Sequence, residues 1–162
     1  YKTASILYVN NPYGQGLAEQ FKESFEKNGG KVLAMVPHEE KASETYTAEL
    51  KKALKGKPDV LCAYSYPQHA KIYLKEAIEF YKYKNFLFCD GTKSEVIIKT
   101  VGAKNLEGGL GTVAASVKGK AGDIFNKAYK AEFGKLPPLP YITNAYDAMV
   151  VIALAAYAAK VQ

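Results

Sequence analysis

The fold is decided by residues 5–30, which read SILYVNNPYGQGLAEQFKESFEKNGG. The opening run SILYV is apolar, and the Asn-Asn-Pro turn cluster that follows ends it, as expected for a short strand. Leu17, Phe21 and Phe25 then recur every four residues, which predicts one face of a helix. The Gly-Gly pair at the end of the stretch ends that helix. A strand followed by such a helix is the first half of a βαβ unit.

The same alternation continues along the chain. Further strands are predicted at residues 32–36, 59–64, 86–89 and 109–113, with helices between them at residues 46–54, 70–78 and 94–100. The strands are apolar throughout, as expected when helices cover both faces of a parallel sheet. We therefore predict an α/β fold, a doubly wound parallel sheet with the flavodoxin-like strand order 2-1-3-4-5.

From about Ala114 the rhythm changes. Two helices follow with no strand between them, at about residues 121–133 and 142–160, and the Pro-rich linker at 135–140 is predicted to be stiff and extended. The second helix contains the apolar run Ala148–Ala159, broken only by Tyr157. We therefore divide the chain into an α/β lobe, residues 1–113, and a helical segment, residues 114–162. A helix that is apolar on nearly every side must be buried on several sides, so the helical segment is incomplete by itself.

Composition limits the classes of function. A chain of 162 residues can bury one sizeable core, and its longest apolar run falls well short of the roughly 20 residues of a membrane span. The net charge of +6 raises nucleic acid as a partner, but all 22 basic residues are lysines scattered among glutamates. Arginine, whose fork reads guanine and clamps phosphate, is absent. We expect a solvated lysine surface and no nucleic-acid partner.

Soft metal ligands are few. The chain has two cysteines and two histidines, which are Cys62, Cys89, His38 and His69. No spacing among them is that of a zinc site, so we predict no metal and no cofactor. A strand cysteine is usually a small buried apolar residue. If Tyr66 and Asp90 lie level at the sheet edge, the two cysteines are offset by about 10 Å along the sheet, too far apart for a disulfide.

A candidate site follows from the predicted topology. In an open α/β sheet, ligands bind beyond the carboxyl ends of the strands where the strand order reverses. Tyr13 follows the first strand, Tyr66 the third and Asp90 the fourth. Each has a simpler interpretation alone, as part of a tight turn, but two aromatic rings and one carboxylate together are typical of a small-molecule pocket. A phosphate loop is not indicated, because Glu19 stands where the third glycine of G-x-G-x-x-G belongs.

The segments around these residues resemble a known family. Asn11-Pro12-Tyr13-Gly14-Gln15-Gly16-Leu17-Ala18, directly after an apolar strand, is similar to the opening of the second lobe in the Leu/Ile/Val-binding family of type I periplasmic binding proteins. The family's later landmarks follow in order, at residues 58–60, 64–67, 86–91, 107–109, 128–135 and 144–148. The resemblance covers nearly the whole chain.

The resemblance implies roles for the site residues. In that family the second lobe presents tyrosines to the apolar part of the ligand and a carboxylate to its α-ammonium group, which by position are Tyr13, Tyr66 and Asp90. Asp90 stands where the amino-acid binders typically have the longer Glu, and the loop around Tyr66 is one residue shorter. These departures leave the ligand open. The groups that hold the α-carboxylate come mainly from the first lobe, most of which precedes Tyr1, and we expect the chain to be cut from something longer.

The resemblance therefore implies a ligand-binding component of an ABC importer, with a small amino acid or related solute as ligand and a membrane permease as partner. It implies a periplasmic or extracellular location, and lipid anchoring of the full-length protein is one form that this location can take. The alternative is a ligand-sensing domain of a regulator or receptor with the same fold. An enzyme is not favoured, because we find no Ser-His-Asp set, metal cluster or close carboxylate pair around the pocket.

The resemblance also predicts a lobe crossing. In the family the chain passes between lobes near the end of the fifth strand, here close to Val113–Ala115. The two C-terminal helices would then belong to the other lobe. We expect them either to extend away from the sheet of residues 3–113 or to be buried by a second copy of the chain, because large exposed apolar patches tend to find a partner.

Overall fold

The chain divides into two compact units, Tyr1–Val113 and Ala114–Gln162. The structure, a computed structural model, describes residues 1–115, 118–137 and 141–159.

The first unit is built on a five-stranded sheet. Its strands are β1 (Thr3–Val9), β2 (Lys31–His38), β3 (Val60–Tyr64), β4 (Phe86–Phe88) and β5 (Leu110–Gly111). Their order is β2-β1-β3-β4-β5 and every neighbouring pair is parallel. The predicted α/β class and strand order are confirmed. β5 is shorter than predicted, because only two of its residues pair with β4.

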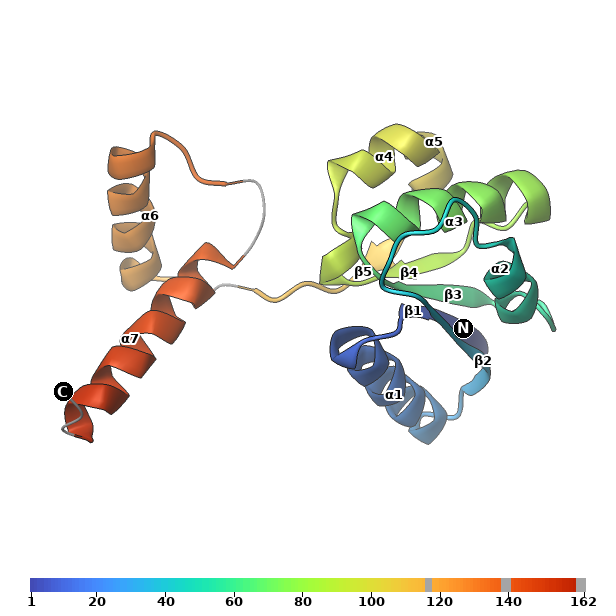
Figure 1. Cartoon of the computed structure of the whole chain (residues 1–162), viewed down its shortest axis with the longest axis horizontal. Helices are drawn as coiled ribbons and strands as arrows, with labels where there is room; N and C mark the ends of the chain where they lie inside the picture. Colours follow the sequence, from blue (N-terminus) through green and yellow to red (C-terminus); the bar gives the residue numbers. More distant parts are fainter. Residues whose placement is uncertain (116–117, 138–140, 160–162) are drawn as a thin grey trace. The chain divides into compact units, whose positions relative to one another are not determined.

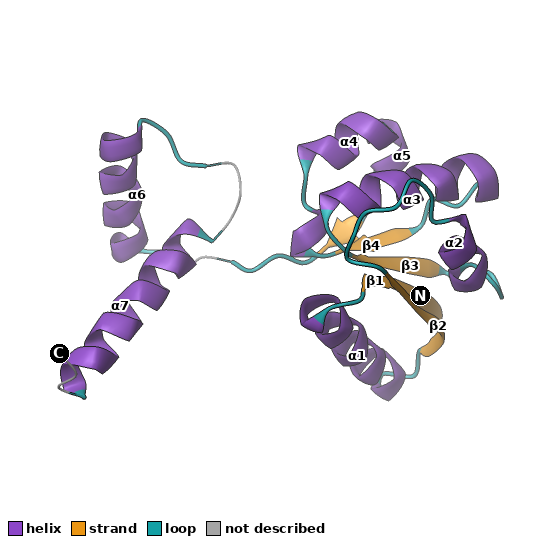
Figure 2. Ribbon diagram, in the orientation of Figure 1, coloured by secondary structure: helices purple, strands orange, loops and turns teal. Residues whose placement is uncertain are grey.

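Helices cover both faces of this sheet. They are α1 (Pro12–Lys27), α2 (Thr47–Ala53), α3 (Pro67–Tyr81), α4 (Glu95–Val101) and α5 (Ala103–Leu106), together with the 3-10 turn η1 (Asp90–Thr92). α1 lies on one face, and α2, α3 and α4 lie on the other (Figures 1 and 2). The short α5 was not predicted, because four residues are too few to show a helical period.

Alternate strand residues supply two apolar layers. Ile6 and Cys62 point toward α1 and form one buried cluster with Ala18. Leu7 and Leu61, their neighbours in the sequence, point the other way and pack with the residues of α2, α3 and α4. Because successive strand side chains face opposite sides of a sheet, the continuous apolar strands noted in the sequence are buried on both faces.

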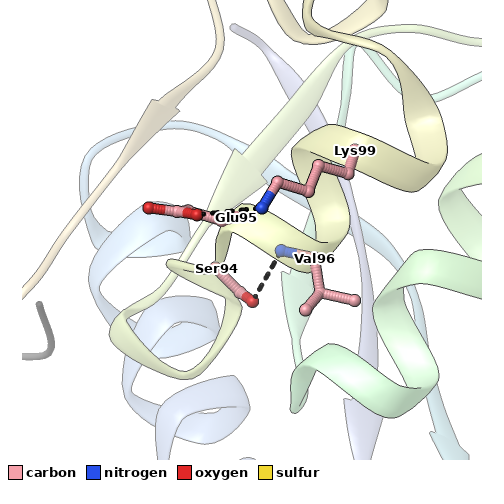
Figure 3. Close-up of polar contacts among 4 residues, drawn as sticks. All are labelled: Ser94, Glu95, Val96 and Lys99. Atoms are coloured by element: carbon pink, nitrogen blue, oxygen red, sulfur yellow. Dashed lines mark hydrogen bonds and ion pairs between the residues drawn. The ribbon is translucent and has the colours of Figure 1, made fainter.

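α4 begins at a side-chain cap close behind η1. The Ser94 hydroxyl accepts a hydrogen bond from the Val96 amide at 3.2 Å (Figure 3). Lys99 Nζ lies 3.2 Å from Glu95 Oε2 one turn apart, but both side chains are exposed, so this pair adds little stability. The cap therefore sets where α4 starts and limits the path of the chain after Asp90.

The second unit contains two helices, α6 (Lys120–Phe133) and α7 (Ile142–Ala158). Gly134, at φ 77°, ends α6 in the left-handed region that glycine favours. Phe125 of α6 and Tyr146 of α7 have ring centroids 5.1 Å apart, which joins the two helices. Both predicted helices are present, whereas residues 138–140 of the predicted linker and residue 160 lie outside the described residues.

α7 exposes apolar side chains along its length. None of its residues is buried, and Met149, Ile152 and Leu154 are 65%, 62% and 62% exposed. Among the described residues, the helices are all too short or too polar to span a bilayer.

Candidate functional site

The carboxyl ends of β1 and β3 lie beside each other, since Tyr8 pairs with Tyr64 in parallel register. Each end turns at once into a helix that begins with proline, Pro12 for α1 and Pro67 for α3. Proline suits the first helical position, because its ring fixes φ and its missing N–H has no helical partner there. The Asn11 side chain also accepts a hydrogen bond from the Gly14 amide at 3.0 Å. These short turns keep the following side chains at the sheet edge.

The three predicted site residues meet at this edge. The rings of Tyr13 and Tyr66 are stacked, with centroids 5.4 Å apart and planes 11° from parallel. The Tyr13 hydroxyl donates a hydrogen bond to Asp90 Oδ1 at 2.7 Å. All three side chains are partly buried. Three separate strand ends thus contribute to one group, and the role of these residues in binding stays a prediction.

The structure adds a polar bridge that was missed in the sequence. Asn11 Nδ2 lies 3.3 Å from the Tyr66 hydroxyl and 3.0 Å from Glu40 Oε1, so it donates toward both. Glu40 belongs to the loop after β2 and is exposed. Only the position of Glu40 after β2 could have indicated it from the sequence, since β2 ends at the same edge as β1. A second carboxylate therefore lies next to the aromatic pair, on the Tyr66 side.

Two buried histidines hold the loop that carries Glu40. His38 Nδ1 lies 2.8 Å from the Glu39 carbonyl oxygen, and His69 Nε2 lies 2.9 Å from that of Glu40. Because a carbonyl can only accept, both ring nitrogens carry the proton. The two rings are in contact, with centroids 4.6 Å apart. They tie the chain after β2 to α3 and so position the loop at the site.

The sequence predicted no Ser-His-Asp set around the pocket, and the structure brings one serine and one histidine together there without the third member. His38 Nε2 lies 2.6 Å from the Ser65 hydroxyl oxygen, which the parallel register of the strand ends brings within reach. The pair differs from a hydrolytic triad in two ways. Ser65 is fully buried and His38 is 3% exposed, and a backbone carbonyl stands behind Nδ1 where a triad has a carboxylate. The geometry is that of a structural link between β2 and β3.

The two cysteines are buried and free. Burial raises the pKa of the Cys62 thiol to about 12, so it stays protonated at neutral pH. The predicted offset between them was too large, since Cys62 pairs with Leu87 and Cys89 lies two residues further along, about 7 Å along the strand. Among the described residues, no group of three or more His, Cys, Asp or Glu side chains could hold a metal ion.

The buried imidazole of His38 makes stability depend on pH. Burial lowers the pKa of His38 below its usual value of about 6.5, and His69 lowers it further. The folded state therefore binds fewer protons than the unfolded chain, and this stability is present above about pH 6.5 and is lost as the pH falls through the folded pKa. We expect the free energy of unfolding to fall by about 1 kcal/mol between pH 7.5 and 5.5, as measured by urea unfolding. The variant His38→Gln should lose most of this pH dependence, and an equal fall in both proteins would contradict the assignment.

Comparison with known proteins gives a family match and a set of similar folds. A sequence profile of a family described as periplasmic binding protein matches residues 1–162. Comparison with curated protein sequences finds no match.

Among solved structures, a leucine binding protein from Thermotoga maritima MSB8 superposes with a TM-score of 0.69 at 23% identity, over 84% of this chain and 39% of that one. A putative branched-chain amino acid ABC transporter from Silicibacter pomeroyi gives 0.72 at 19% identity, over 96% and 39%. A fatty acid ABC transporter substrate-binding protein from Thermomonospora curvata gives 0.61 at 20% identity, over 84% and 36%. At these identities the likeness shows the fold, and the chain spans 36% to 39% of the length of these structures.

Proposed function

Since the chain belongs to the periplasmic binding protein family, whose profile matches it from residue 1 to residue 162, we propose that it is the second lobe, and part of the first, of a two-lobed solute-binding protein. It binds a small amino acid or related solute between the lobes and delivers it to the membrane permease of an ABC importer. The longer protein acts outside the cytoplasm.

The observation that carries this proposal is the meeting of Tyr13, Tyr66 and Asp90 at one sheet edge. This edge is the place where the strand order reverses and where open α/β sheets bind their ligands. A carboxylate beside an aromatic stack suits a solute with a cationic group and an apolar part. The other lobe closes over that edge by a hinge motion, which removes the solute from water.

The Asp90 carboxylate favours one class of solute over another. The structures that share this fold carry names that mention leucine in one case and fatty acid in another, so the fold alone does not select a ligand. A carboxylate at the edge attracts an ammonium group and repels the carboxylate of a fatty acid. The site therefore favours a ligand with an amino group.

Residues 114–162 fit a role in the other lobe. The large apolar side chains of α7 are exposed from Tyr146 to Tyr157, up to 84% for Tyr157. A soluble protein rarely leaves so large an apolar helix face in water. We propose that the strands of the first lobe, from chain that precedes Tyr1 in the longer protein, cover it there.

A binding screen on the two-lobed protein tests this function. We expect one or more of the L-amino acids to raise its free energy of unfolding, by about 2.7 kcal/mol at 100 times the Kd, as measured by thermal or urea unfolding. Lauric acid, an apolar solute with no amino group, serves as the contrast and should give no shift. Stabilisation by lauric acid alone would contradict the proposal.

A further inference from the structure

The Tyr13 hydroxyl is committed to the turn that carries Asp90. It donates to Asp90 Oδ1 at 2.7 Å, accepts from the Gly91 amide at 3.1 Å and lies 3.3 Å from Cys89 Sγ. A phenol has one proton and two lone pairs. The proton goes to the carboxylate and the amide donates to a lone pair, while either partner of the Tyr13–Cys89 contact could be its donor. The hydroxyl thus contacts three consecutive residues of one turn.

The packing around Gly91 matches this commitment. A Cβ at Gly91 would lie 2.6 Å from the Tyr13 hydroxyl and 2.6 Å from the Ser65 carbonyl oxygen. Both are closer than any side chain tolerates, so the turn approaches Tyr13 only because glycine stands there. The absence of a side chain at Gly91 therefore lets the turn contact the Tyr13 hydroxyl, with the carboxylate of Asp90 directly beside it.

The state of the phenol suits a donor. Burial raises the pKa of Tyr13 above its usual value, and the hydrogen bonds to Cys89 and Asp90 raise it further. The hydroxyl therefore keeps its proton at neutral pH. Its ring is covered on one face by Tyr66, which leaves less of Tyr13 for contact with a solute than the resemblance implies.

We propose that Tyr13 is a positioning residue, whose hydroxyl fixes the Asp90 carboxylate in the orientation that receives the cationic group of the solute. Tyr13 thus acts on the solute through Asp90, whereas Tyr66 contacts it directly. The influence of Tyr13 on solute affinity rests on the proposed function, but the hydrogen bonds of its hydroxyl to the turn do not. The two parts are therefore tested separately.

The hold on the turn is tested without a solute. In Tyr13→Phe, the Gly91 amide loses its acceptor, and its hydrogen exchange measured by NMR should become about tenfold faster. Tyr83→Phe is the matched control, because the Tyr83 hydroxyl donates to the Pro58 carbonyl at 2.9 Å, before the start of β3. It should leave Gly91 exchange unchanged. Unchanged exchange in Tyr13→Phe overturns the proposal.

The action through Asp90 is tested by a double-mutant cycle in the two-lobed protein. The probe is L-leucine, or the L-amino acid that replaces it in the screen above, and the readout is Kd by calorimetry. Tyr13→Phe alone should weaken binding about tenfold. In an Asp90→Ala background it should weaken binding by less than about twofold, because the hydroxyl then has no carboxylate to hold.

Equal losses in both backgrounds would show that Tyr13 contacts the solute itself and would overturn the proposal. Should the unmodified protein bind no L-amino acid, the proposed function fails, while Gly91 exchange still decides whether Tyr13 holds the turn.

Discussion

The substitution Asp90→Ala in the two-lobed protein is expected to weaken binding of an L-amino acid by at least about 2 kcal/mol, or about thirtyfold. The reason is that a cation enclosed between two lobes loses its charged partner, and the lost pairing is not replaced by water. Tyr66→Phe should cost less, about 0.5–1.5 kcal/mol, because only a neutral hydrogen bond is removed. Calorimetric titration measures both.

The matched control is another aspartate of the same unit. Asp59 Oδ2 accepts hydrogen bonds from the amides of Lys2 and Thr3 at 2.7 and 2.8 Å, at the amino end of the sheet. Asp59→Asn removes a negative charge there and should leave the affinity unchanged. An affinity that is equal in Asp90→Ala and the unmodified protein would return Asp90 to a plain turn role, and loss of affinity in Asp59→Asn would point to a general charge effect.

The second large effect is expected at Gly14, which lies in the first turn of α1 beside Tyr13. A Cβ there would lie 2.2 Å from the Val9 carbonyl oxygen and 2.7 Å from Val9 Cγ1. Backbone atoms cannot move aside as a flexible side chain can. We therefore expect Gly14→Ala to lower the free energy of unfolding by about 3 kcal/mol, measured by urea unfolding.

Gly16 gives a control two residues away. A Cβ at Gly16 would meet no atom within 4 Å other than those of its chain neighbours and its own helix backbone, and Gly16 also lies within α1. Gly16→Ala should stabilise the protein by about 0.5–1 kcal/mol, because alanine loses less backbone entropy in a helix. Similar changes in both variants would mean that α1 does not pack against the end of β1 as described.

The sequence predicted the fold well because its signals are local. The apolar run before Asn10 and the period of Leu17, Phe21 and Phe25 suffice to define a strand and a helix. The site residues followed from the same rule, since parallel strands end at one edge. β2 ends at this edge too, so the loop that carries Glu40 lies beside the site, although no aromatic pair or turn motif marks it in the sequence.

What could not be predicted depends on register. Whether His38 reaches Ser65 is set by how β2, β1 and β3 align, which no local pattern encodes. The distance between Cys62 and Cys89 also depends on register. The predicted offset assumed that Tyr66 and Asp90 lie level, which would pair Cys62 with Phe86. In the structure, Cys62 pairs with Leu87 instead. The hydrogen bond from Tyr13 to Asp90 could not be predicted either, because it depends on the path of the turn after β4.

We propose above all that the carboxyl edge of the residue 1–113 sheet is one wall of a binding site for a solute with an amino group. A crystal structure of the two-lobed protein with its bound L-amino acid tests this most directly. We predict the solute's ammonium nitrogen about 3 Å from an Asp90 carboxylate oxygen, and its apolar part against the ring of Tyr66. A solute that contacts neither Asp90 nor Tyr66 would contradict this proposal.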